Sequence, residues 1–140
     1  MIERFSHSNV RRMIGCDVNP AARASAEKNL RAAGIHNLVE LNDWDASSLH
    51  LPDAKVDAIV ADLPFGIAVG SHDENVQVYP AMLTDAARVA KAGARFVAMT
   101  QEVRLFQELI ESSDDWLLED VKRIQLRGLN QRIYVLKRTI

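Results

Sequence analysis

The chain has 140 residues, with 17 Lys and Arg against 19 Asp and Glu, a formal net charge of -2, and 48% hydrophobic residues. This size and composition are typical of one globular domain and exclude a mainly disordered chain. The polar N-terminal segment and the lack of an apolar run near the roughly 18 residues that span a bilayer argue against a signal peptide and a membrane span, so we expect a cytoplasmic protein.

Short β-branched runs alternate with longer runs rich in Ala, Leu, Glu, Lys and Arg, which predicts strands alternating with helices around a parallel sheet. Asn19 and Pro20 are suited to begin the first helix, and Gly34 is suited to end it. In chain order we expect strands at 12–18, 37–41, 56–61 and 95–100, helices at 20–33, about 79–91 and 102–112, and a hairpin with strands 117–126 and 132–137 around the turn 128–130.

Acidic residues follow three of the predicted strands. Asp17 ends the first strand, Asp45 follows the second by a few residues, and Asp62 ends the third. In open α/β sheets, ligands bind beyond the carboxyl ends of the strands, where an acid accepts hydrogen bonds from ribose hydroxyls or an amine. Each also has an ordinary interpretation, since Asp17 can begin the next helix and Asp45 can cap a turn. Their order and separation favour one shared crevice.

The segment Asp62-Leu63-Pro64-Phe65-Gly66 is suited to binding a planar amino group. A carboxylate and a backbone carbonyl both accept hydrogen bonds from an amine, and an aromatic ring can stack on the base that bears it. Pro64 restricts the residue before it, so the Leu63 carbonyl is held in an extended direction. A simple turn with a buried Phe65 is the alternative.

The region from Met13 to Thr100 resembles class I S-adenosylmethionine-dependent methyltransferases, and DLPFG resembles their amino-methylating motif. More narrowly, IGCDVNPAARASAEKNLRAAGI, DWDASSL and DLPFG, followed by Gly70-Ser71 and Asn75, resemble the THUMP-associated tRNA guanine-N2 methyltransferases. The resemblance implies a Rossmann-like α/β fold whose sheet is mostly parallel with an antiparallel C-terminal hairpin. It also implies methyl transfer from S-adenosylmethionine to guanine N2 of tRNA.

The resemblance assigns roles to particular residues. Asp17 would hold the ribose of the cofactor and Asp45 its adenine amine, while Asp62 and the Leu63 carbonyl would orient the guanine amino group. Methyl transfer then depends on positioning two reactants in line, without a metal or a covalent nucleophile. The implied cofactor-binding residues are Asp17, Val18, Asp45, Ala46 and Asp62. The implied catalytic residues are Asp62, Leu63, Pro64 and Phe65, with Phe65 stacking on the base.

One part of the family pattern is absent from the sequence. The family sheet begins with a strand and a glycine-rich loop of the form DPxCGSGT, and nothing before Met13 resembles them. That first strand is central, between the strands that here end at Asp17 and Asp62. We therefore expect residues 1–140 to form a single truncated methyltransferase domain with its first strand missing. It would meet RNA through a longer parent protein, and its exposed sheet edges would favour a homodimer.

Other functions fit parts of the same pattern. An adenine-N6 methyltransferase, or another amino-group methyltransferase acting on DNA, rRNA or protein glutamine, needs the same arrangement around the amine. A nicotinamide-dependent oxidoreductase can use Asp17 for its cofactor, but it requires neither DLPFG nor the hairpin. A non-catalytic fragment of a methyltransferase is a third alternative. One cysteine and four scattered histidines predict no metal site and no internal disulfide.

Overall fold

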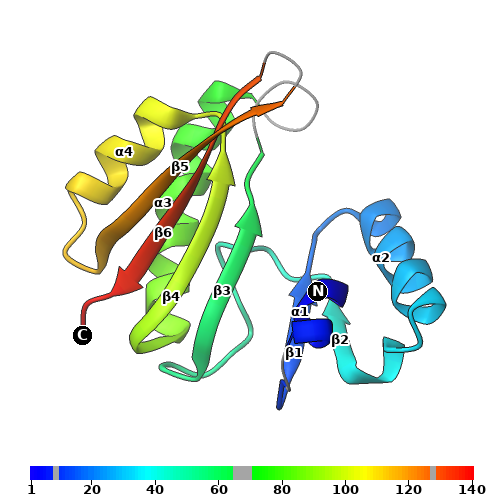
Figure 1. Ribbon diagram of the computed structural model, residues 1–140. Helices are drawn as coiled ribbons and strands as arrows, with labels where there is room; N and C mark the ends of the chain where they lie inside the picture. Colours follow the sequence, from blue (N-terminus) through cyan, green and yellow to red (C-terminus); the bar gives the residue numbers. More distant parts are fainter. Residues whose placement is uncertain (8–9, 65–70, 127–128) are drawn as a thin grey trace. The chain divides into compact units, whose positions relative to one another are not determined.

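A computed structural model describes residues 1–7, 10–64, 71–126 and 129–140 of the chain (Figure 1). The chain divides into two compact units, Met1–Ser48 and Leu49–Ile140, and each contains its own β-sheet. In the part of the chain that the structure describes, no helix has both the length and the apolar character needed to cross a membrane.

The first unit is built around two parallel strands. It contains, in order, α1 (Ile2–His7), β1 (Met13–Cys16), α2 (Pro20–Ala32), the short 3-10 helix η1 (His36–Leu38) and β2 (Val39–Asn42). The two strands pair in parallel, with Met13 opposite Val39. The Asn19 side chain caps α2 by accepting hydrogen bonds from the backbone N–H groups of the first turn, and Gly34 follows the helix with a φ of 71°. These features confirm the predicted start and end of that helix.

The second unit contains a four-stranded mixed sheet. Its elements are β3 (Val56–Asp62), α3 (His72–Val89), β4 (Ala90–Thr100), α4 (Val103–Glu111), β5 (Trp116–Leu126) and β6 (Leu129–Arg138). The strand order is β3-β4-β6-β5, with β3 and β4 parallel and the other two pairs antiparallel (Figure 1). The predicted C-terminal hairpin is therefore confirmed, and it lies beside β4.

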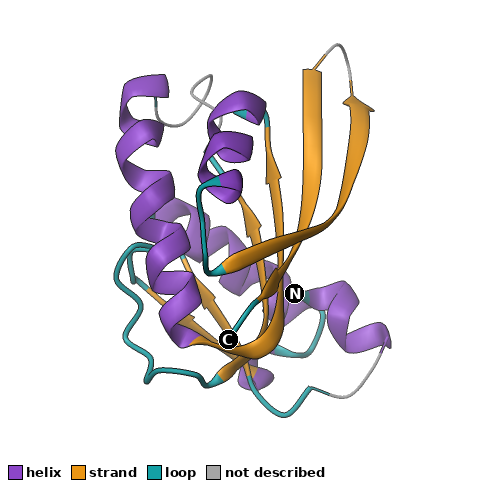
Figure 2. Ribbon diagram, turned by 90° about the vertical axis from the view of Figure 1, so that its left-hand side faces the viewer, coloured by secondary structure: helices purple, strands orange, loops and turns teal. Residues whose placement is uncertain are grey.

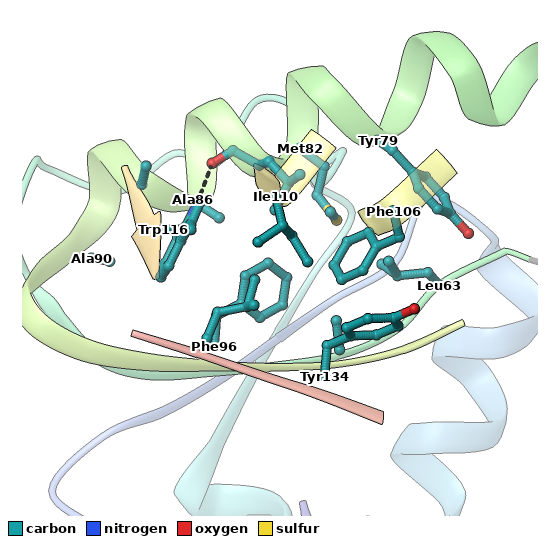
Figure 3. Close-up of a cluster of buried hydrophobic side chains, with 14 of the residues drawn as sticks. Leu63, Tyr79, Met82, Ala86, Ala90, Phe96, Phe106, Ile110, Trp116 and Tyr134 are labelled. Atoms are coloured by element: carbon teal, nitrogen blue, oxygen red, sulfur yellow. Dashed lines mark hydrogen bonds between the residues drawn. The ribbon is translucent and has the colours of Figure 1, made fainter. Parts of the chain in front are cut away.

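Helices α3 and α4 cover one face of this sheet (Figure 2). Figure 3 shows the aromatic side chains between the two layers: Tyr79 comes from α3, Phe106 from α4, and Phe96 and Tyr134 from the sheet. The ring of Phe106 packs edge-on against Tyr134, with 4.9 Å between ring centroids, and against Tyr79, with 6.0 Å. This interior fixes the end of β3 and the N-terminal half of α3 in one framework, because both contribute side chains to it.

Helix α3 begins earlier than the sequence pattern predicts. The pattern predicts a start near Tyr79, but the helix begins at His72 and has Pro80 in its interior. The Ser71 hydroxyl caps the helix by accepting a hydrogen bond from the N–H of Glu74 at 3.2 Å. The acidic residues Asp73 and Glu74 in the first turn also favour this start through the helix dipole. The residues from His72 to Val78, which precede the predicted helix, are thus helical as well.

Smaller differences concern the ends of other elements. Strand β6 starts at Leu129, so Leu129 and Asn130 belong to the hairpin strand and not to its turn. Strand β4 starts at Ala90, directly after α3, five residues before the predicted Arg95. The short helix α1 was not predicted at all. None of these differences changes the order of strands and helices predicted from Met13 onward.

Candidate functional site

In the first unit, Asp17 directly follows β1 and lies on the surface. Its Oδ1 accepts a hydrogen bond from the N–H of Asn19 at 2.8 Å, and its carbonyl accepts one from Nη1 of Arg23 at 2.6 Å. The Asp17 N–H donates to the carbonyl of Asn42 at the end of β2. The Asp17 carboxylate thus helps to form the turn before α2, whose cap is Asn19, and it is exposed and available to a ligand. Val18 beside it is 61% exposed.

Asp45 forms a compact turn after β2. Its Oδ1 accepts hydrogen bonds from the Ser47 hydroxyl at 2.7 Å and from the Ser47 N–H at 2.8 Å. These bonds hold the pKa of the Asp45 carboxyl below its ordinary value, so this group is a carboxylate at neutral pH. Asp45 and Ala46 are both exposed. The turn thus fixes the direction of the Asp45 carboxylate while leaving it accessible.

Asp17 and Asp45 lie at the same end of the two-stranded sheet. The pKa of the Cys16 thiol, at the end of β1, is raised first by burial and then by the negative charges of Asp17 and Asp45. The carboxylates of Asp17 and Asp45 thus both lie near enough to Cys16 to raise the pKa of its thiol. Oxygen acceptors beside an exposed apolar side chain, Val18, suit a ligand that combines hydroxyl or amino donors with a flat apolar surface, as a nucleoside does.

In the second unit, Asp62 ends β3 and pairs in register with Met99 on β4. The side chain reaches the surface, yet the protein around it removes enough water to raise the pKa of the carboxyl. Leu63 follows with only 5% of its surface exposed, and its N–H donates to the carbonyl of Met99 at 2.9 Å. Leu63 is thus anchored to the sheet by its side chain and by its backbone.

The carbonyl of Pro64 is held by two side chains of α3. It accepts a hydrogen bond from the Tyr79 hydroxyl at 2.6 Å and one from Nδ2 of Asn75 at 3.1 Å. Tyr79 and Asn75 are four residues apart and lie on the same face of the helix. Both are buried, with 0% and 1% of their surface exposed. The two residues after Asp62 are therefore fixed at both ends, by β4 and by α3.

Further polar groups extend this arrangement to the start of α4. The Tyr79 hydroxyl lies 2.8 Å from Oγ1 of Thr100, which accepts a hydrogen bond from the N–H of Glu102 at 3.0 Å. The Glu102 carboxylate accepts from Nδ2 of Asn75 at 3.3 Å and lies 3.0 Å from Nδ1 of His72. Burial raises the pKa of the Tyr79 hydroxyl, and the charges of Glu102 and Asp62 add to this effect although the Thr100 hydrogen bond opposes it.

Sequence reasoning missed the roles of Tyr79, Thr100 and Glu102 in this network. Asn75 drew attention only as part of the family resemblance, without an assigned contact. A polar-tipped aromatic residue on the buried face of a helix, and a threonine at the end of a buried strand, are weak signals for such a network. Phe65 lies outside the described residues. Asp17 and Asp45 belong to one unit and Asp62 to the other, so their common crevice stays a prediction.

Comparisons with known proteins agree with these features. The family model described as an RMKL-like methyltransferase domain matches residues 2–132. The chain is 36% identical over 103 residues to the tRNA (guanine(6)-N(2))-methyltransferase THUMP3 of Mus musculus, which is 72% of this chain and 20% of that protein. It is 26% identical over 134 residues to the tRNA (guanine(6)-N2)-methyltransferase of Methanocaldococcus jannaschii, which is 96% of this chain and 35% of that protein.

The fold is similar to that of TrmN from Thermus thermophilus, with a TM-score of 0.84 and 20% identity over 98% of this chain and 40% of that one. This likeness confirms the predicted Rossmann-like methyltransferase fold. The chain spans about a fifth to a third of the length of the curated relatives compared above. Since the family model covers nearly all of the sequence, the chain belongs to the RMKL-like methyltransferase domain family.

Proposed function

We propose that the chain is the catalytic part of an S-adenosylmethionine-dependent RNA methyltransferase that methylates guanine N2 in tRNA. The observation that carries the proposal is the end of β3, where an accessible Asp62 is followed by a Leu63-Pro64 segment anchored to β4 and α3. The family membership and the names of the two relatives support the same reaction.

The first unit would supply the cofactor contacts. S-adenosylmethionine, when bound, provides a methyl group on a positively charged sulfur. The exposed carboxylates of Asp17 and Asp45 would accept hydrogen bonds from its ribose hydroxyls and adenine amine, respectively. Val18 offers apolar contact to the adenine, and Ala46 sits beside Asp45 without a bulky side chain. The hydrogen-bond acceptors and the apolar side chain present in this unit thus fit a nucleoside.

The second unit would orient the acceptor. Asp62 and the Leu63 carbonyl accept hydrogen bonds from the guanine amino group, which directs its nitrogen toward the methyl group. As the new N–C bond forms and the S–C bond breaks, positive charge develops on that nitrogen and one of its protons must leave. The Asp62 carboxylate would stabilise this charge and accept the proton, and its raised pKa makes it a stronger base than an ordinary aspartate. Phe65 would stack on the base.

The partners follow from the substrate. An RNA substrate would be bound with the help of parts of the protein outside these residues, and a cytoplasmic location is part of the same proposal. A homodimer through sheet edges also remains our proposal. It is supported by β3, which is an edge strand of its four-stranded sheet among the described residues.

The test is an assay of the protein with transcribed tRNA and S-adenosylmethionine, followed by mass spectrometry of the nucleosides. We expect N2-methylguanosine. N6-methyladenosine in its place would show an adenine methyltransferase, which uses the same arrangement around the amine. Failure to methylate any nucleoside or protein, combined with no binding of S-adenosylmethionine in isothermal titration, would identify a non-catalytic member of the family.

The role of Asp62 is tested by the substitution Asp62→Ala. We expect kcat to fall by about 100-fold or more, because both orientation of the amine and acceptance of its proton are lost. Asp57→Ala is the matched control, since Asp57 is an exposed acid on the same strand that pairs with Lys91 instead. Equal methyl transfer by the two variants would contradict the assignment of Asp62.

A further inference from the structure

The hydrogen bonds around Tyr79 have a direction that follows from counting hydrogens. The Tyr79 hydroxyl has one hydrogen, which it donates to the Pro64 carbonyl at 2.6 Å. The Thr100 hydroxyl, 2.8 Å away, must then donate its own hydrogen to the Tyr79 oxygen. The Thr100 oxygen in turn accepts from the N–H of Glu102 at 3.0 Å. A directed chain therefore runs from Glu102 N–H through Thr100 and Tyr79 to the Pro64 carbonyl.

This chain acts on the backbone at the proposed amine site. The proline ring fixes φ of Pro64, and two donors on its carbonyl fix ψ. The N–H of Leu63 is bound to Met99 on β4, and Pro64 restricts the conformation of Leu63. The Leu63 carbonyl lies between these two anchors, so its direction is set by them.

We propose that Tyr79, oriented by Thr100, is a positioning residue that aims the Leu63 carbonyl at the amino group of the substrate. The inference deepens the proposed function and rests on it. It states that buried residues of the second unit orient the backbone that binds the amino group. Tyr79 does not touch the substrate in this role. Its effect passes through the Pro64 carbonyl.

Two observations favour this role over simple packing. Tyr79 and Thr100 are fully buried, where each hydrogen bond is stronger than in water and successive bonds polarise one another. Oδ1 of Asn75 is buried and has no hydrogen-bond partner among the described residues, although Nδ2 of the same side chain donates to the Pro64 carbonyl. An unpaired buried acceptor carries a cost that an apolar residue at this helix position would avoid. What Asn75 provides in return is the hydrogen bond from its Nδ2 to the Pro64 carbonyl.

The main test compares Tyr79→Phe with Tyr134→Phe. Both changes remove one hydroxyl from a fully buried tyrosine that packs on Phe106, but the Tyr134 hydroxyl interacts with the Val103 carbonyl, at a long 3.4 Å, and with the Arg132 side chain, not with Pro64. We expect Tyr79→Phe to lower kcat for tRNA methylation about tenfold with KM changed less than about twofold, since positioning is lost and binding is kept. Tyr134→Phe is expected to keep the kcat of the unmodified protein.

A second pair of variants guards against misfolding of the first. Thr100→Val keeps the shape of the side chain but removes the donor to Tyr79, and Thr100→Ser restores the hydroxyl. We expect kcat to fall about threefold in Thr100→Val and to be largely recovered in Thr100→Ser, because a hydrogen bond between neutral groups contributes modestly. If Thr100 had only a structural role, kcat in both variants would change in proportion to their thermal stability, and Thr100→Ser would not recover kcat.

Amide hydrogen exchange tests the same inference without catalysis. The N–H of Leu63, bound to the Met99 carbonyl, should exchange about tenfold faster in Tyr79→Phe than in Tyr134→Phe after correction for global stability. Equal exchange and equal kcat in the two tyrosine variants would overturn the inference. If the unmodified protein forms no N2-methylguanosine, the proposed substrate is wrong, and the exchange at Leu63 still decides whether Tyr79 positions this segment.

Discussion

At the scale of single residues, the Asp62 carboxyl reaches the surface, but the protein around it removes part of its hydration water. Burial raises its pKa above the ordinary value of about 3.9. If the carboxylate is the active form, kcat/KM should fall as the pH drops through this raised pKa, earlier than for an ordinary aspartate. A pH profile of methyl transfer measures this acidic limb.

The control for that profile is Asp62→Asn, which cannot ionise. Its residual activity should lack the acidic limb assigned to Asp62. An unchanged limb in this variant would assign the titration to another group.

The same carboxyl makes a prediction about stability. A raised pKa in the folded state means that folding favours the protonated form, so ionisation of Asp62 costs stability as the pH rises through that pKa. Asp62→Asn should therefore be slightly more stable than the unmodified protein at pH 7, and this difference should shrink below pH of about 3.9, where both states are protonated. Urea unfolding at the two pH values checks this. A variant less stable at pH 7 would contradict it.

The sequence predicted some members of the candidate site and not others, for a physical reason. Asp62, Leu63 and Pro64 are consecutive, so their chemistry can be read from one segment. Tyr79 and Thr100 come from α3 and β4 and meet the Pro64 carbonyl only in the folded chain. Short-range patterns contain little information about such distant polar contacts, because helix and strand periodicity explains only which residues are buried.

At the scale of elements, Arg88 near the end of α3 connects the helix to the segment before β3. Its guanidinium donates to the carboxylates of Asp85 and Asp53 and to the carbonyls of Leu49 and Leu51. A lysine ammonium is a point charge with three donors and cannot match this planar, five-donor geometry. We expect Arg88→Lys to lower the melting temperature measurably.

The matched control for this change is Arg104→Lys on α4. Arg104 is 93% exposed and forms one ion pair with Glu108. Exposed pairs of this kind contribute little to stability, so the melting temperature of this variant should stay within measurement error. Equal effects of the two substitutions would mean that the contacts of Arg88 do not hold the segment.

The start of α3 illustrates why element boundaries are harder to predict than elements. Apolar residues at helical spacing, among them Leu83, Ala86 and Ala90, predict a helix from about Tyr79. The actual start depends on Ser71 as the cap and on Asp73 and Glu74 in the first turn. The packing of Asn75 and Tyr79 against the end of β3 then stabilises a helix that includes an interior proline. Local capping and tertiary packing together set this boundary.

At the scale of the whole molecule, the order of strands and helices was predictable from Met13 onward because hydrophobic periodicity is local. The division of the strands into two sheets was less predictable from periodicity. Strands β1 and β2 form one sheet, and β3, β4, β6 and β5 form another. Strand pairing depends on contacts far apart in sequence, and the predicted list of strands does not determine them. The hairpin of β5 and β6 was predictable because its strands adjoin along the chain.

The two units differ in how much apolar surface they bury. In Met1–Ser48, Leu30 and Val39 are the buried apolar side chains among the described residues, whereas a continuous aromatic and aliphatic cluster fills Leu49–Ile140. A small unit with so few buried apolar side chains has limited stability of its own. We therefore expect Met1–Ser48 to unfold at a urea concentration about 1 M lower than Leu49–Ile140.

The two tryptophans provide one probe for each unit, Trp44 in the first and Trp116 in the second. Trp116 is buried in the cluster, where its Nε1 donates to the Leu83 carbonyl at 3.1 Å. Labelling with fluorotryptophan gives one fluorine resonance for each, and the spectrum of Trp44→Phe assigns them. The Trp44 resonance should convert to its unfolded form first as urea increases. Coincident transitions at both tryptophans would instead show that the two units unfold as one cooperative structure.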